Sequence, residues 1–506
     1  MLQTARSFKH RLKVTYPNGE KNVHSKSIVS FIVLALSSSA LFAETLPLKS
    51  VNKAGAVIDA AIAAHGGAEN ISNLKTVVRK SDFTNIATGQ SRKPGPPYDR
   101  NQAWNFNAID LEKDIFVAKN KGEGGGYVFK QGTVINGQNS WQLDYRAGTA
   151  APIAEPDFNT QSGPFVRVTP VLLMRQLQSR RNTSNWLGEA DLDGRKHDVI
   201  TLVMEVGPAL ALYIDQESHM LTRMERVLPP FGQVEYRFLD YTMVDGIAFN
   251  QKFQLYVNGD DNLIIDIKDT QVNVPLDDYL QVPSNLDKVA AITPAEFGSQ
   301  EIDEGVFLIG GNGTYSLFVE MEDHVVAIGG TQTVPASIKE MRKEIADKPI
   351  KYGVLTHHHS DHVPGAAAYA EEGATIITFE ENRQVVLKAA GNDQAKLEFV
   401  EDRMTLTDGD RTIELYNIGP TPHAENILIA YLPDQGIIFE ADHFPQPANG
   451  MIPPAVPATA AFARRLDELN LEYTKLVGAH SPRVASPEDV KKAIGYKSAS
   501  TVGGQQ

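Results

Sequence analysis

The chain has 506 residues and 42% hydrophobic content, which is enough for more than one globular domain. Its formal net charge of −14 argues against a nucleic-acid-binding protein, because such proteins normally present a basic surface. It contains no cysteine, which excludes disulfide bonds, thiolate metal ligands and the acceptor of a lipoprotein anchor.

Residues 1–43 have the features of a signal peptide. Lys26 precedes an apolar run from Ile28 to Leu36, and small residues suited to cleavage follow. The run is shorter than the roughly 20 apolar residues that a membrane-spanning helix requires. The polar stretch before Lys26 is longer than a signal peptide normally has. We therefore expect a soluble protein without an integral membrane span, periplasmic or secreted, with cleavage after Ala40 or Ala43.

Residues 44–290 are expected to form a mainly antiparallel β domain. One helix is predicted from Ala54 to Ala64 and another from Pro170 to Gln178, where proline suits the first turn. Strands dominate the rest of this region. Apolar residues alternate over residues 234–238 and again over 253–257, with an Asp-Gly turn between the two runs.

The β domain offers weaker functional signals. The glycine-rich segment 122–126 lacks the Gly-Lys-Ser/Thr ending of a phosphate-binding loop, so we interpret it as a surface turn. The order of strands and helix, together with a short sequence such as Leu-Tyr-Ile-Asp at residues 212–215, weakly resembles periplasmic lipoprotein-sorting domains. Such a sheet would bind an apolar ligand or an envelope partner, or serve as a scaffold for the next domain. Three histidines of this region lack the spacing of metal ligands: His65, His197 and His219.

Residues 291–496 are predicted to form the second domain, and residues 497–506 a disordered tail. Short apolar runs alternate here with helix-compatible segments. Mixed sheets with helices on their outer faces would give an αββα sandwich, with functional side chains on loops at one edge. The fold class expected for the whole chain is α+β.

A cluster of four histidines and one aspartate directly follows a predicted strand of the second domain. Residues 356–362 read Thr-His-His-His-Ser-Asp-His. In extended backbone alternate side chains point to one side, so His357, His359 and Asp361 can converge while His358 points away. Imidazole and carboxylate groups are suitable zinc ligands, and the cluster is large enough to begin two metal sites.

Further candidate ligands lie later in the chain. His423, Asp442 and His480 each follow an apolar, strand-like run, so that loops at a sheet edge would carry them. These distant candidates argue against the alternative, in which the histidine cluster is only a solvated loop.

This order of motifs resembles the metallo-β-lactamase superfamily of dinuclear hydrolases. The pattern is H-x-H-x-D-H, then a lone histidine, an aspartate after a strand and a final histidine. The resemblance covers about the last two fifths of the chain. It implies one metal held by His357, His359 and His423, another held by Asp361, His362 and His480, and Asp442 as the bridging ligand.

The resemblance also implies the chemistry. Two zinc ions would lower the pKa of a shared water from 15.7 to roughly 7, and the resulting metal-bound hydroxide would attack a small-molecule substrate. Asp361 is expected to orient this water as well as to bind metal. Asp442 as a bridging ligand favours hydrolysis of an ester, lactone or related acyl bond. Gly329 departs from the family, which commonly has at this place an aspartate that supports the metal site.

Several alternatives stay open. Export favours β-lactam hydrolysis as the next candidate, and phosphoester hydrolysis is a third. The same ligands can hold iron, which would suit a redox or sulfur-oxidising enzyme. A non-catalytic envelope-binding protein is a further alternative, with its function in residues 44–290. Other residues near the motifs are not assigned a role: Asn312, Tyr315, Asn426 and His443.

Overall fold

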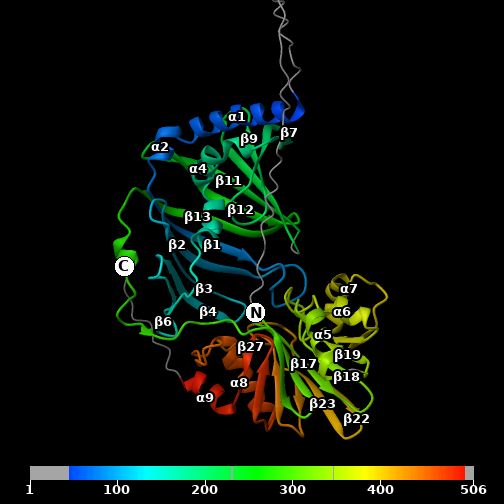
Figure 1. Ribbon diagram of the computed structural model, residues 1–506. Coiled ribbons are helices and arrows are strands. Elements are labelled where there is room, and N and C mark those ends of the chain that lie inside the picture. Colours follow the sequence, from blue (N-terminus) through cyan, green and yellow to red (C-terminus); the bar gives the residue numbers. More distant parts are fainter. Residues whose placement is uncertain (1–44, 230–231, 346, 496–506) are drawn as a thin grey trace, which may run out of the picture. The chain divides into compact units, whose positions relative to one another are not determined.

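The computed structural model describes residues 45–229, 232–345 and 347–495 (Figure 1). The predicted signal peptide and the predicted tail lie outside these residues. From Leu46 onward the described chain forms one compact unit. No helix within the described ranges is both long enough and apolar enough to cross a membrane.

The first part of the chain builds a single sheet, which we call the fourteen-stranded sheet. Its strand order is β14-β6-β5-β4-β3-β2-β1-β13-β12-β11-β10-β9-β8-β7. Its strands pair antiparallel, except that β14 runs parallel to β6. The strands are β1 (Thr76–Ile86), β2 (Arg100–Asp110), β3 (Ile115–Gly124), β4 (Tyr127–Ile135), β5 (Trp141–Asp144), β6 (Thr149–Pro152), β7 (Trp186–Leu192), β8 (Arg195–Leu202), β9 (Leu210–Asp215), β10 (Leu221–Leu228), β11 (Gly232–Val244), β12 (Ile247–Val257), β13 (Asp260–Val272) and β14 (Asp287–Lys288).

The two strands predicted from alternation are confirmed as β11 and β12, which pair on either side of the expected turn, with Val244 opposite Ile247. Helices pack against this sheet and share one buried apolar cluster with it. They are α1 (Leu46–Ala64), α2 (Ala68–Ser72), α3 (Phe158–Arg167) and α4 (Pro170–Arg180), with short 3-10 turns η1 (Arg181–Thr183) and η2 (Asp277–Tyr279).

The helix predictions were partly right for this region. α4 begins at the predicted proline, whereas α1 begins eight residues before the predicted start. Leu46 and Leu48 are 81% and 50% exposed, so the first two turns of α1 carry no apolar face that a pattern could reveal. α3 was missed because Gly163 and Pro164 interrupt it, and Asp157 starts it by accepting hydrogen bonds from two backbone N–H groups.

The second part of the chain contains two further sheets. One has the order β15-β16-β17-β18-β19-β20-β21 and the other β22-β23-β24-β25-β26-β27. The first comprises β15 (Gly298–Asp303), β16 (Val306–Gly311), β17 (Thr314–Glu320), β18 (Val325–Ile328), β19 (Ile350–Val354), β20 (Thr375–Thr378) and β21 (Leu397–Phe399). The second comprises β22 (Arg403–Asp408), β23 (Arg411–Asn417), β24 (Leu428–Leu432), β25 (Ile437–Glu440), β26 (Lys475–Gly478) and β27 (Ser481–Ala485).

These two sheets and their helices form four layers. One buried cluster joins apolar side chains of both sheets, such as Leu317 and Phe439. A second cluster joins the first sheet to its helices, and a third joins the other sheet to its own. Figure 1 shows α5, α6 and α7 beside β18 and β19. The helices are α5 (Val334–Glu344), α6 (Ala366–Glu371), α7 (Arg383–Ala390) after the 3-10 turn η3 (Glu380–Asn382), α8 (Pro457–Leu469) and α9 (Pro487–Gly495).

The α+β class and the αββα sandwich are therefore confirmed. Residues 289–297, between β14 and β15, contain no helix or strand. The predicted domain boundary at residues 290 and 291 falls in this segment and stays a prediction.

Candidate metal centre

The candidate ligands follow the ends of strands in both sheets of the sandwich. The histidine cluster comes directly after β19, Asp442 after β25 and His480 after β26. β18 runs parallel to β19 and β25 runs parallel to β26, so the loops that follow these strands leave their sheets at the carboxyl ends. His423 lies in the loop between β23 and β24.

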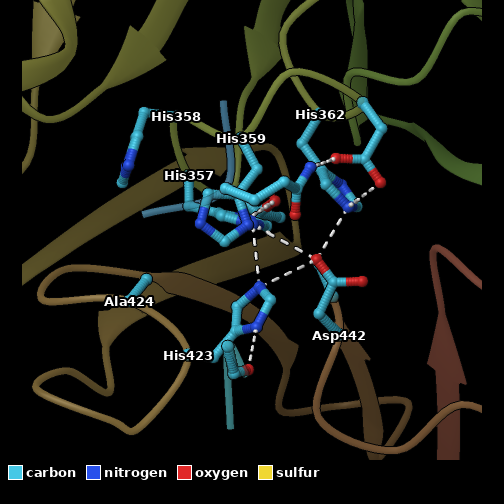
Figure 2. Close-up of polar contacts among 12 residues, drawn as sticks. His357, His358, His359, His362, His423, Ala424 and Asp442 are labelled. Atoms are coloured by element: carbon cyan, nitrogen blue, oxygen red, sulfur yellow. Dashed lines mark hydrogen bonds and ion pairs between the residues drawn. The ribbon is translucent and has the colours of Figure 1, made fainter. Parts of the chain in front are cut away.

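All seven candidates fall into two groups that could each hold a metal ion. Within each group, one nitrogen or oxygen atom per residue lies within 4.8 Å of the others. The first group is His357, His359, His423 and Asp442, and the second is Asp361, His362 and His480. In Figure 2 the imidazoles of the first group and the carboxylate of Asp442 point toward a common centre, whereas His358 points away.

The carboxylate of Asp442 contacts both groups. Its Oδ2 lies 3.2 Å from Nε2 of His357 and 3.2 Å from Nε2 of His423. The same oxygen lies 2.7 Å from Nε2 of His362, and Oδ1 lies 3.1 Å from Nε2 of His480. One side chain therefore joins the two groups, as a bridging ligand would.

The electrostatics of the centre favour ionised carboxylates. Burial raises the pKa of the Asp361 and Asp442 carboxyl groups, but contacts with His362 outweigh it and hold both below their usual range. Burial lowers the pKa of His359 to about 3. Burial alone would lower the pKa of His362 and His480. Their contacts with Asp361 and Asp442 outweigh burial and raise the pKa to about 9 for His362 and about 11 for His480. Because metal ligands must be deprotonated, metal binding is expected to release protons here.

The donor atoms fit a pair of divalent cations. Nε2 of His357 lies 3.2 Å from Nε2 of His423, and Nε2 of His362 lies 3.1 Å from Nε2 of His480. Two imidazole nitrogens that face each other can share only one proton, whereas a cation between them uses both lone pairs. The buried Nδ1 of His359 has no hydrogen-bond partner among the residues described. Imidazole and carboxylate ligands suit zinc and iron alike.

Backbone carbonyl groups in the β1–β2 and β3–β4 connections of the fourteen-stranded sheet hold the outer nitrogens of two candidate ligands. His423 Nδ1 donates to the carbonyl oxygen of Gly125 at 2.7 Å, and His359 Nε2 donates to that of Ser91 at 3.0 Å. Such contacts set the tautomer and the ring orientation of ligating histidines. Of residues 122–126, which the sequence predicted to be a surface turn, the first three end β3 and the last two form the turn into β4. None of the five is buried, but the turn also lies against His423 of the metal centre.

A side chain of the β1–β2 connection and one at the start of β4 also reach the centre. Gln90 Nε2 donates to Asp361 Oδ1 at 2.7 Å. The Tyr127 hydroxyl donates to the backbone carbonyl of Asp442 at 2.5 Å, and its ring lies edge-on to His423 with 5.9 Å between centroids. Both residues were missed from the sequence. Nothing in their local pattern distinguishes them from other polar residues in a β region.

The loop that carries Asp442 is tightly organised. Asp442 has a φ of 61°, in the left-handed region that residues other than glycine rarely adopt. Buried Glu440 accepts hydrogen bonds from the backbone N–H groups of His443 at 2.7 Å and Phe444 at 3.2 Å. Burial raises the pKa of Glu440 to about 7. The sequence did not point to Glu440, although it stands only two residues before a candidate ligand.

Neither group includes His65, His197, His219, His358 or His443. His358 Nε2 donates to the carbonyl of Ser91 at 2.8 Å, in agreement with a role in the scaffold. His443 is buried beside the centre, where its ring nitrogens contact the carbonyl of Ala441 and the hydroxyl of Thr421.

The departure at Gly329 has a steric explanation. Its φ is +110°, and a Cβ atom added there would lie 3.0 Å from Ser316 Oγ. A side chain at this position would strain the backbone and crowd the neighbouring strand. Aspartate therefore does not fit here without local rearrangement.

An αββα sandwich with a cluster of histidines and aspartates at one edge defines a class of metal-binding domain. Residues 309–480 match the family model described as the metallo-beta-lactamase superfamily, and this part of the chain belongs to that superfamily. No curated protein matches the chain. The weaker resemblance of residues 44–290 to lipoprotein-sorting domains has no counterpart in these comparisons and stays a prediction.

Solved structures of low sequence identity are similar to about two fifths of the chain. A metallo-beta-lactamase from Pontibacter korlensis is 20% identical, with 39% of this chain and 96% of that chain covered and a TM-score of 0.32. The flavodiiron protein from Giardia intestinalis is 18% identical, with coverages of 40% and 58% and a TM-score of 0.32. A sec-alkylsulfatase from Pseudomonas sp. is 15% identical, with coverages of 39% and 40% and a TM-score of 0.32.

Proposed function

We propose that this protein is a dinuclear zinc hydrolase that cleaves an ester, lactone or related acyl bond. The observation that supports this most is the Asp442 carboxylate, whose Oδ2 contacts histidines of both groups and whose Oδ1 contacts His480 of the second. When bound, a pair of zinc ions would polarise an acyl group and would lower the pKa of a bound water to about 7. The residues of the chain then position this water and the substrate.

Asp361 is the candidate for orienting the water and receiving its proton. Its Oδ1 accepts a hydrogen bond from Gln90, while Oδ2 lies 3.4 Å from His362 Nε2 and 3.5 Å from His480 Nε2. Its side chain is 41% exposed, whereas that of His362 is fully buried. Asp361 is therefore the ligand most open to an incoming molecule, and its carboxylate is ionised at neutral pH.

The experiment combines metal analysis with a substrate panel. Purified protein is loaded with zinc, and esters, lactones, thioesters, β-lactams and phosphodiesters are assayed before and after chelation. We expect two zinc ions per chain and turnover of esters or lactones that chelation abolishes and added zinc restores. Preferred turnover of β-lactams or phosphodiesters would select those alternatives. Bound iron with oxygen consumption and no hydrolysis would overturn the proposal.

A substitution tests the role of Asp361. Asp361→Ala is expected to lower kcat/KM by at least about 100-fold, since it removes a metal ligand and the proposed proton acceptor. The circular dichroism spectrum should stay unchanged, because the side chain is partly exposed. Asp393→Ala removes an exposed loop aspartate outside both groups and is the matched control. Full activity of Asp361→Ala would contradict the assignment.

We also propose that the protein is exported, on the basis of the apolar run and the small residues within positions 1–43. Expression of the full chain in a Gram-negative host, followed by N-terminal sequencing of the periplasmic fraction, tests this. A mature N-terminus at residue 41 or 44 is expected. Uncleaved protein in the cytoplasm would contradict export.

A further inference from the structure

A cavity of about 230 Å³ lies beside the metal centre, on the side of the fourteen-stranded sheet. Of the described residues that line it, His423 alone comes from the sandwich, and the others come from β1 to β4 and the turns next to them. Gln90, which donates to Asp361, is also part of its wall. The cavity therefore borders one ligand of the first group and the hydrogen-bond partner of a ligand in the second.

Aromatic side chains form much of the wall. Phe83 comes from β1, and Tyr127 and Phe129 come from β4. Alternate residues of a strand share a face, so Tyr127 and Phe129 face the cavity while Val128 between them faces away. Ala103 on β2 contributes only a methyl group and so leaves room. An apolar cavity of about 150 Å³ holds benzene, so this one is large enough for a substituted ring.

The polar residues of the wall carry no positive charge. They include the amides of Asn85 and Asn101 and the carboxylate of Glu123. Within the described chain, no lysine or arginine lines the cavity. A carboxylate or phosphate group held among these side chains would lose its hydration without gaining a lysine or arginine partner, and Glu123 would repel it.

We infer that this cavity is the substrate pocket of the metal centre, and that it takes an uncharged, ring-sized apolar group attached to the bond that is cleaved. The inference rests on the proposed function and deepens it. It assigns substrate selection to the fourteen-stranded sheet, while the sandwich carries the metal ligands.

The first test compares small esters with the zinc-loaded full chain in a pH-stat. Methyl acetate has no ring, benzyl acetate carries a ring on the alcohol side and methyl phenylacetate carries one on the acyl side. We expect kcat/KM for the better ring ester to be at least tenfold higher than for methyl acetate. The same ring ester with a carboxylate at the para position should lose this tenfold advantage in kcat/KM over methyl acetate. Equal turnover of all these esters would overturn the inference while leaving the proposed function intact.

Substitutions locate the effect in the pocket. Ala103→Phe fills the cavity and should lower the ratio of kcat/KM between ring ester and methyl acetate at least tenfold, mainly through KM. Val128→Phe introduces the same ring on the opposite face of β4 and should leave that ratio unchanged. Phe129→Ala enlarges the cavity and should shift preference from benzyl acetate toward 2-naphthylmethyl acetate. Unchanged preferences in both pocket variants would contradict the inference.

Binding provides a readout that does not need hydrolysis. Ligand-observed NMR with phenylacetamide, in the presence of a chelator, is expected to show binding to the unmodified chain and none to Ala103→Phe. The para-carboxylated amide should not bind. If no ester is hydrolysed but phenylacetamide binds in this way, the proposed function fails and the pocket stands. If phenylacetamide does not bind and the esters show no ring preference, the pocket inference fails.

Discussion

Among single residues, Asp442 stands out because its carboxylate contacts four histidines of the metal centre, which a residue in a solvated loop would not do. Its backbone lies in the left-handed region, with a φ of 61°, and its carbonyl accepts the hydroxyl of Tyr127. A residue other than glycine in this conformation costs of order 1–3 kcal/mol and persists only where neighbours hold it. We therefore expect Tyr127 to position Asp442, the proposed bridging ligand.

Tyr127→Phe tests this role. A hydrogen bond contributes about 0.5–1.5 kcal/mol, so we expect affinity for zinc to fall roughly three- to tenfold while the ring preserves the packing. Competition with a chromophoric chelator measures the affinity. Tyr256→Phe also removes one hydroxyl hydrogen bond, to Gln254, on a strand outside the centre. Zinc affinities that are equal in the two variants would contradict the role of Tyr127.

His65 gives the protein a pH-dependent stability away from the metal centre. It is fully buried at the end of α1, where Nδ1 donates to the carbonyl of Ala61 and the ring packs edge-on against Tyr241. Burial lowers the pKa of His65 from 6.5 to about 4. The unfolded chain therefore binds a proton in this window that the folded chain does not, so stability falls as the pH drops from 6.5 toward 4.

His65→Gln removes this contribution. Between pH 7.5 and pH 5, the unmodified chain should lose about 2 kcal/mol more of its free energy of unfolding than the variant does. Urea unfolding at the two pH values measures the difference. Comparing pH dependence rather than absolute stability separates the titration from any packing defect of the variant. The same pH dependence in both chains would show that His65 does not titrate as described.

Among the elements of the fourteen-stranded sheet, the turn between β3 and β4 packs directly against the metal centre. Gly126 has a φ of +80°, and an added Cβ would lie 2.9 Å from Ala458 Cβ and 3.2 Å from the backbone nitrogen of His423. The Gly126 carbonyl also accepts the backbone N–H of Ala458 at 3.0 Å. Glycine is needed here for close approach as well as for its backbone conformation.

Gly126→Ala is expected to weaken zinc binding by about tenfold, because the added methyl group displaces the turn whose Gly125 carbonyl orients His423. Gly259→Ala is the matched control, since Gly259 has a φ of +89° in another hairpin but open space around its Cβ position. Both variants carry similar backbone strain. Zinc content after dialysis should fall in the first alone, and an equal loss in both would point to strain rather than to contact with the centre.

At the scale of the whole molecule, the metal centre joins loops from both sheets of the sandwich. A metal that binds only the folded chain stabilises it by about 2.7 kcal/mol when its free concentration is 100 times its dissociation constant. We expect the melting temperature to fall by several degrees on chelation and to recover when zinc is added. His480→Ala should abolish most of this zinc-dependent increase. A melting temperature that does not respond to zinc or chelator would argue against a metal that links these loops.

Much of the sandwich and of the centre could be predicted from local sequence. Strands such as β16, β17 and β19 are short apolar runs bounded by turns, and their character does not depend on distant residues. The seven candidate ligands also stand out locally, because histidine and aspartate directly after apolar strands have few structural uses. The structure brings all seven together in two groups, although their occupation by zinc stays a proposal.

The surroundings of the centre were decided by tertiary structure. Every residue carries a backbone carbonyl group, so no pattern could show that those of Ser91 and Gly125 would hold the ligand histidines. The same applies to the pocket, whose wall comes from four strands that are aligned only by the register of the sheet. Which side chains can bind metal is readable from the sequence alone, because it is a property of residue type and local position. Which backbone groups orient them, and what lies across from them, depended on how the sheets pack.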